Sequence, residues 1–314
     1  MTAYLLRRLL SGVLVVFAVA ALTFLLQRAV PGGPFTTEKG LPPEVLENLK
    51  KHYGLDAPVP VQLARVLAGV PVLDFGDSMK YRGRPVRDIL LDAAPASLQL
   101  GLQAFVLAVT LGLSLGFVSG WRRAKGGAKD FTDGALQVFT AMGVALPNFV
   151  VAGILILFFS FYWPILPPAR WEGPLHSILP SLALAAAPTA YIARLARSSL
   201  LSALSEPHIR TARAKGVSEG AVILRHAVPG ALYTILTILG PLLAALVTGS
   251  FVIETVFGIP GMGRFFVSSV VDRDYTVILG ITVFYTAILA GANLAVDLLY
   301  TLADPRVRVG KEGP

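Results

Sequence analysis

The segment LSEPHIRTARAKGVSEGAVILRHAVP, residues 204–229, is basic and lies between two long apolar runs. Pro207 suits the first turn of a helix, and the side chain of Ser205 or Glu206 can cap that turn. Gly216 fits the left-handed position that commonly ends a helix. The pattern therefore predicts a short helix that stops at Gly216.

A second short helix is expected after this turn. Ser218 can cap it, Glu219–Ala227 form its body, and Pro229 is expected to close it where the next apolar run begins. The segment as a whole resembles a helix-turn-helix of about two dozen residues rather than a featureless loop between membrane spans.

The first of these helices has a cationic face and a small-residue side. Arg210 and Arg213 are three positions apart and share a face, whereas Ala212 and Ala214 would let another backbone approach closely. Such an element fits a groove on a cytosolic partner. The alternative is a solvated basic loop that contacts lipid headgroups, and these residues alone leave both readings open.

The composition around this segment is that of an integral membrane protein. The chain has 314 residues, of which 54% are hydrophobic and only 15% are charged, and its mean hydropathy is +0.68; a soluble domain has about 25% charged residues. We attribute the net charge of +8 to cytoplasmic loops rather than to nucleic-acid binding. There is no cysteine, and the four histidines lack ligand spacing, so we expect no metal site.

The N-terminal apolar run is the first predicted span. Leu9–Gln27 carries no charge and follows Arg7 and Arg8. A cleaved signal peptide would have a shorter apolar region and a small-residue cleavage site. We therefore expect a retained transmembrane helix within residues 1–30, with its N-terminus in the cytoplasm.

Five further apolar runs are each long enough to cross a bilayer. The sequence thus predicts an all-α membrane protein with six transmembrane helices and both termini on the cytoplasmic side of the cell membrane. A cytoplasmic tail, 304–314, follows the last span. The runs are about Ser97–Gly120, Ala135–Trp163, His176–Leu195, Ala231–Ile253 and Thr276–Tyr300.

The charges of the short connections support this orientation. Arg122, Arg123, Lys125 and Lys129 follow the second span, and basic residues also follow the sixth, whereas the loop between the third and fourth spans holds one arginine and one glutamate. This is the positive-inside bias, and it places Leu204–Pro229 in the cytoplasm.

A hydrophilic segment, 31–94, separates the first two spans and is expected outside. Pro42-Pro43-Glu44 is expected to begin a short helix that Gly54 stops. Gln62–Leu67 is expected to form a second short helix. Gly76–Asp88 is expected to be extended or turn-like and to lead into the second span.

Ionisable residues within the spans are few. Arg194 and Arg197 lie near the cytoplasmic end of the fourth span, and Asp297, near the same end of the sixth, could pair with one of them. No span has a central row of acids or histidines, which disfavours a proton- or sodium-coupled transporter. Two interpretations of the glycines and prolines within the spans stay open. Either membrane helices simply tolerate them, or they allow close helix packing and bending.

The stretch ETVFGIPGMGRFFVSSVVDRDY, residues 254–275, follows the fifth span. Its glycines and proline predict tight turns, and Arg264–Val271 predicts a short helix. A packed outer loop is the plain interpretation. The functional one is an outer gate or a contact for a binding protein, with candidate residues Glu254, Gly258, Pro260, Gly261, Gly263 and Arg264.

RTARAKG, followed ten residues after its glycine by HAVP, resembles the EAA loop, E-A-A-x3-G-x9-I-x-L-P, of binding-protein-dependent ABC importer permeases. Ala212, Gly216 and Pro229 match that pattern, whereas Arg210, Thr211 and His226 stand where its first Glu, its first Ala and its Ile would be. TARAKG itself is similar to the version in permeases of the dipeptide/oligopeptide/nickel group. So are YLLRRLLSGVLVVF near the N-terminus, the 254–275 stretch and the tail LADPRVR.

This resemblance implies the type I importer permease fold, with a permease domain over 94–303. It also implies a second homologous permease as heterodimer partner, two cytosolic ATPase subunits that hold ATP and Mg, and an extracytoplasmic solute-binding protein. The solute would be a peptide or a related small molecule. The residues implied in ATPase coupling are Glu206, Arg210, Thr211, Ala212, Arg213, Lys215, Gly216, Val217 and Pro229.

The chain lacks a nucleotide-binding motif of its own. Gly310-Lys311 is followed by Glu312 rather than by Ser or Thr, so no G-x4-G-K-[ST] loop is present. We therefore do not expect an enzyme. The alternatives are a secondary transporter or channel that works without an ATPase, and a membrane-anchored scaffold, for which no sequence feature speaks.

Overall fold

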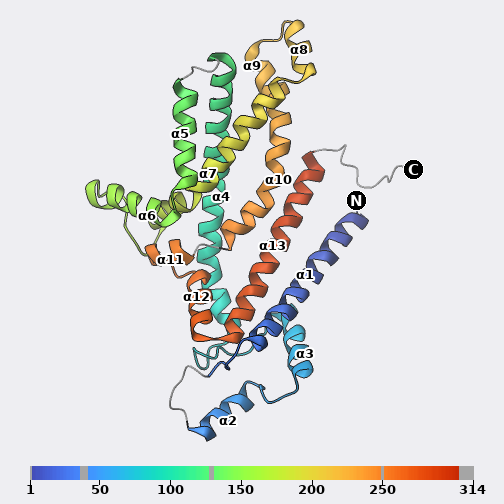
Figure 1. Ribbon diagram of the computed structural model, residues 1–314, viewed down its shortest axis with the longest axis vertical. Coiled ribbons are helices and arrows are strands. Elements are labelled where there is room, and N and C mark those ends of the chain that lie inside the picture. Colours follow the sequence, from blue (N-terminus) through green and yellow to red (C-terminus); the bar gives the residue numbers. More distant parts are fainter. Residues whose placement is uncertain (1, 36–41, 127–130, 249–250, 304–314) are drawn as a thin grey trace. The chain divides into compact units, whose positions relative to one another are not determined.

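The computed structural model describes residues 2–35, 42–126, 131–248 and 251–303, and every regular element in those ranges is helical (Figure 1). The chain divides into two compact units. Unit 1 comprises residues 1–98 and 260–314, and unit 2 comprises residues 99–259. The boundary falls within the long helix α4 (Val86–Gly126), which contributes to both units.

In unit 1, the first and last long helices run antiparallel. They are α1 (Thr2–Ala29) and α13 (Tyr275–Ala303). Arg8 Nε lies 3.1 Å from Asp297 Oδ2 at one end, and Gln27 Nε2 donates to the Tyr275 carbonyl oxygen at 3.0 Å at the other. The expectation that Asp297 pairs with Arg194 or Arg197 is therefore wrong, because an arginine on α1 is its neighbour.

The hydrophilic segment of unit 1 forms short helices, as predicted. Its two α-helices each begin after a proline with an extended backbone, and Gly54 ends the first of them with φ of 61°. The segment 76–88 is only partly extended, since α4 already begins at Val86; a bridge joins Asp77 to Pro85. The helices are α2 (Pro43–His52), α3 (Val59–Gly69) and the 3-10 helix η1 (Val70–Val72).

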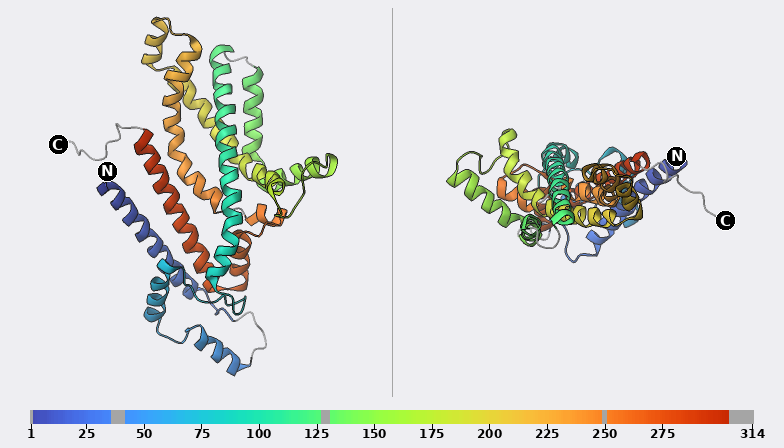
Figure 2. Two further views of the ribbon diagram at one scale, coloured as in Figure 1. Left: turned by 180° about the vertical axis from the view of Figure 1, so that it is seen from behind. Right: turned by 90° about the horizontal axis from the view of Figure 1, so that it is seen from above.

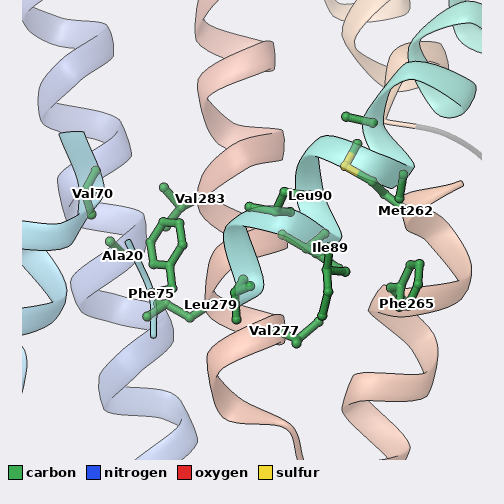
Figure 3. Close-up of a cluster of buried hydrophobic side chains, with 14 residues drawn as sticks. Ala20, Val70, Phe75, Ile89, Leu90, Met262, Phe265, Val277, Leu279 and Val283 are labelled. Atoms are coloured by element: carbon green, nitrogen blue, oxygen red, sulfur yellow. The ribbon is translucent and has the colours of Figure 1, made fainter. Parts of the chain in front are cut away.

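The buried core of unit 1 joins this segment to the spans. Phe75 lies between α1 and α13, and Ile89 and Leu90 of α4 pack beside Leu279 (Figure 3). Met262 and Phe265 come from α12 (Met262–Asp272), and the Met262 N–H donates to Ser97 Oγ at 2.9 Å. The short helix predicted at Arg264–Val271 is thus present and slightly longer.

Unit 2 contains most of the remaining helices. Its α7 is the most buried candidate span. Its elements are the second part of α4, α5 (Phe131–Ala145), α6 (Asn148–Ile156), the π-helix η3 (Leu157–Tyr162), α7 (Pro174–Leu204), α8 (Pro207–Ala214), α9 (Glu219–Ala221), the π-helix η4 (Val222–Ala227), α10 (Val228–Val247) and α11 (Phe251–Phe257).

The third predicted span, Ala135–Trp163, is not one straight helix. The chain bends by 109° between Phe131–Ala145 and Asn148–Tyr162, and Figure 2 shows α6 turning away from the end of α5. Pro147 stands at the break with ψ of 143°. An apolar run has the same composition on both sides of such a bend, so hydropathy alone missed it.

Small residues bring the helices of unit 2 close together. A Cβ on Gly112 of α4 would lie 2.7 Å from the Ile192 Cβ of α7, and one on Gly143 of α5 would lie 2.9 Å from the Ala190 Cβ. These glycines therefore serve close helix packing, one of the two interpretations that the sequence left open. The described ranges hold five helices long and apolar enough to cross a membrane, or up to seven if two pairs of shorter helices each count as one span.

Candidate coupling site

Helix α8 ends in the turn that the sequence predicts. Gly216 has φ of 78°. Its N–H donates to the Arg213 carbonyl oxygen at 2.9 Å, and the Val217 N–H donates to the Ala212 carbonyl oxygen at 3.2 Å. These two bonds form a Schellman motif, which satisfies carbonyls at the helix end. Glu206 stands at the N-cap position, but its side chain makes no capping hydrogen bond.

One side of α8 is buried against its own unit. Ile209 is fully buried and Ala212 is 7% exposed. Both pack in a hydrophobic cluster with Val222, Ile223 and Ala227 of the following helical segment, and with Leu200 and Leu204 at the end of α7. Ala212 is thus small because α8 approaches its own chain here. The close backbone approach predicted at Ala212 is therefore made to helices of this chain.

The opposite side of α8 is exposed. It combines cationic side chains with small and hydroxyl-bearing ones, so it is positively charged. Its exposed residues are His208, Arg210, Thr211, Arg213, Ala214 and Lys215. Of the alanine pair noted in the sequence, only Ala214 is available to another molecule.

An ion pair bridges the turn and was not predicted. Arg213 Nε donates to Glu219 Oε2 at 3.1 Å, and Arg213 Nη2 donates to Glu219 Oε1. Hydrogen bonding to this carboxylate raises the pKa of the Arg213 guanidinium above its ordinary value. The two residues are six apart, a spacing that only the reversal at Gly216 brings together. The helix-ending glycine in the sequence was the signal from which this ion pair could have been predicted.

The second predicted helix is present, but Pro229 does not close it. Ser218 occupies the N-cap position without a side-chain cap, and α9 passes through η4 directly into α10. Pro229 lies in the first turn of α10, where a missing N–H costs little. Residues Glu219–Val247 are therefore one continuous helical span of 29 residues.

A buried polar cluster in unit 2 was also missed. Asp133 of α5 is 2% exposed. It accepts hydrogen bonds from Arg197 Nε at 2.7 Å, from Arg197 Nη2 at 2.8 Å and from the Ser119 hydroxyl. The cluster joins α4, α5 and α7 beside a cavity of about 440 Å³ that Arg194 and Gln137 also line. It was overlooked because Asp133 precedes the apolar run that defined the third span.

The candidate outer-contact residues differ in exposure. Gly258, Pro260 and Arg264 are exposed, and Gly258 has φ of 64°. Glu254 is 1% exposed, so its carboxylate lies inside this chain rather than on its surface. Gly261 and Gly263 are buried as well. The set also spans the boundary between the two units at residue 260.

No group of three or more potential ligand side chains that could hold a metal ion occurs among the described residues. Long apolar helices, with a basic helical hairpin between α7 and α10, are the features of a polytopic membrane protein.

The chain belongs to the family of inner membrane components of binding-protein-dependent transport systems, whose model matches residues 104–309. The N-terminal model of the same membrane component matches residues 1–100. It is an ABC importer permease, and the prediction made from the loop and its flanking stretches is confirmed.

Curated relatives match over the entire length. The chain is 42% identical to the dipeptide transport system permease protein DppB of Bacillus subtilis, over 100% of both chains. It is 39% identical to the oligopeptide transport system permease protein OppB of Escherichia coli K12, over 98% of this chain and 100% of the relative.

Solved structures share the fold. The MetNI methionine ABC transporter in inward-facing conformations matches with a TM-score of 0.52 and 16% identity, over 69% of this chain and 97% of that chain. An amino acid ABC transporter matches with a TM-score of 0.50 and 17% identity, over 70% and 95%. The predicted type I importer permease fold is therefore confirmed.

Proposed function

We propose that this chain is one of two different permease chains of an ATP-driven importer for dipeptides, oligopeptides or a related small solute. The full-length similarity to dipeptide and oligopeptide permeases supports the solute class. The single structural observation that carries the coupling role is α8, which exposes a cationic face and is anchored to two spans by the opposite face.

The exposed face of α8 is the docking surface for a cytosolic ATPase subunit in this proposal. Its residues are Arg210, Thr211, Arg213 and Lys215, with Glu206, Gly216 and Val217 at its two ends. Force on this face passes through Ile209 and Ala212 into η4 and the end of α7, because those side chains share one buried cluster. Pro229 acts at the entry of α10 rather than at the docking surface.

ATP and Mg would be bound by the two ATPase subunits, because this chain has no phosphate-binding loop. A second homologous permease would complete the translocation pathway. The termini and α8 would face the cytoplasm, in keeping with the positive-inside pattern. The segment 31–94 would then lie outside the cell membrane, before the permease domain 94–303.

An extracytoplasmic binding protein would deliver the solute on that outer side. The exposed Gly258, Pro260 and Arg264 support a contact or gate there, and the buried Glu254, Gly261 and Gly263 would shape the turns behind it. Arg264 is the best candidate for a direct contact, with its guanidinium carbon 5.0 Å from the centre of the Phe265 ring.

Reconstitution tests the proposal. Vesicles that contain this permease, its paralogous permease, both ATPase subunits and the binding protein should accumulate a radiolabelled dipeptide only with ATP. Vesicles that lack the ATPase subunits should not. Concentrative or facilitated uptake without any ATPase would instead establish the rival function, a secondary transporter or channel.

A further inference from the structure

Unit 1 holds a cavity that is separate from the candidate coupling site. Its volume is about 530 Å³, and it lies where α1 ends and α13 begins, beneath α3. Phe24, Arg28, Arg65 and Leu279 are among its lining residues. A second cavity of about 620 Å³ adjoins it and shares Arg28.

Two arginines from different helices face the first cavity. Arg28 of α1 places its guanidinium carbon 5.3 Å from the centre of the Phe24 ring. Arg65 of α3 lies against the backbone of Gly54, since a Cβ there would be 2.6 Å from Arg65 Nη1. Within the described ranges, neither arginine forms an ion pair. Asp74 also lines the cavity, and its Oδ1 accepts the Gly76 N–H at 3.1 Å.

The rest of the wall is largely apolar and comes from both spans. Phe24, Val66, Phe75 and Leu279 line it, and Phe75 and Leu279 also belong to the buried core in Figure 3. Gln27 and Tyr275 lie near the ends of the candidate spans Leu6–Ala29 and Tyr275–Leu298. Lipid headgroups meet acyl chains at the end of a span, so a cavity there can reach both.

We propose that this cavity binds one membrane phospholipid, with its phosphate between Arg28 and Arg65 and its upper acyl region against Phe24 and Leu279. Guanidinium groups hold phosphate oxygens through paired, charge-assisted hydrogen bonds. Free inorganic phosphate shares that chemistry but would leave the apolar wall unfilled. The same arginines could hold a peptide carboxylate, but a hydrophilic peptide has no acyl chain to cover the apolar wall of the cavity.

The bound lipid would join three elements that are far apart in the sequence. It would connect α3 of the hydrophilic segment to the paired ends of α1 and α13, so that this segment stays docked at the membrane surface. The inference concerns this chain alone and does not depend on the transported solute.

Native mass spectrometry of the full transporter complex, released from phospholipid nanodiscs, tests the proposal. The wild-type complex should retain one phospholipid per copy of this chain. Arg28→Gln combined with Arg65→Gln should reduce that retention about tenfold or more, the effect of losing charged hydrogen bonds. Arg28→Lys combined with Arg65→Lys should retain it in part, since the charge remains.

A control variant and two competitors make the result decisive. Arg82→Gln, on the same hydrophilic segment but outside the cavity lining, should retain lipid as the wild type does. Added inorganic phosphate or dipeptide should not displace the lipid. The proposal is overturned if the wild type retains no lipid, if the double Gln variant with an unchanged elution volume retains it fully, or if phosphate or dipeptide competes for the site.

Discussion

The Ser78 hydroxyl donates a hydrogen bond to the carboxylate of Asp274, a residue 196 positions further along the chain and 1% exposed. The same carboxylate accepts the backbone N–H groups of Met79 at 3.2 Å, Lys80 at 3.1 Å and Val277 at 3.2 Å. One buried side chain therefore fastens the loop before α4 to the start of α13.

Asp274→Asn should destabilise unit 1. An amide replaces one acceptor oxygen with a donor that faces other donors, at a cost of about 1–3 kcal/mol in the free energy of unfolding. Thermal unfolding of the purified complex should show a lower midpoint. Asp272→Asn is the matched control, because that carboxylate only meets the half-exposed Lys80 at 3.5 Å, and it should change little. Equal midpoints for both variants would contradict the role of Asp274.

Ala212→Glu should detach α8 from its unit. It places a charge in a buried hydrophobic cluster, so limited proteolysis should cut residues 205–220 faster and ATP hydrolysis should lose its link to uptake. Thr211→Glu adds the same charge one position away on the exposed face. That variant should keep wild-type protease resistance, and a similar cleavage rate in both would argue against the packing role of Ala212.

Arg210→Glu combined with Lys215→Glu should weaken ATPase docking without loosening α8. Both side chains are exposed, and reversed charges on a docking face oppose the approach of the partner. Co-purification should recover about tenfold less ATPase subunit per permease. High salt screens the repulsion between like charges, so the double variant should recover more ATPase subunit at high salt than at low salt. Ser202→Glu, on the exposed side of α7, serves as control. Full recovery from the double variant would remove this face from the interface.

Gly216→Ala should strain the turn after α8. At φ of 78°, a residue with a Cβ raises the free energy of the folded turn by about 1–2 kcal/mol. Hydrogen exchange at the amides of Gly216 and Val217, which close the Schellman motif, should therefore quicken. Gly220 is not among the glycines with positive φ, and a Cβ added there would have no atom within 4 Å. In the control Gly220→Ala, the amides of Gly216 and Val217 should therefore exchange as in the wild type. Faster exchange in the control alone would refute the argument.

Gly112→Val should disrupt the contact between α4 and α7. The added side chain meets the Ile192 Cβ at 2.7 Å and the Thr189 carbonyl oxygen at 3.0 Å, and overpacking of this kind costs about 1–3 kcal/mol. The yield of monodisperse complex and its unfolding temperature should both fall. Gly134→Val, with nothing within 4 Å, should leave both unchanged; the opposite order would be inconsistent with close packing at Gly112.

Local signals in the sequence predicted the helices and the turn at Gly216 correctly, because proline, glycine and apolar length act over a few residues. They failed for side-chain contacts that depend on how segments far apart in the sequence pack together. Asp133 and Arg197 meet only after α5 and α7 pack together, and Arg8 meets Asp297 across nearly the whole chain. The bend at Pro147 escaped because a proline in an apolar run is equally compatible with a tolerated kink.

The uninterrupted helix from Glu219 to Val247 has a mechanical consequence. Its 29 residues form a rod about 43 Å long at 1.5 Å per residue. If α8 tilts this rod by about 10° around its inner end, the far end swings by roughly 7 Å, from the same helix length. A small tilt at the α8 end of this helix is thereby amplified, at its other end, to the width of a peptide backbone.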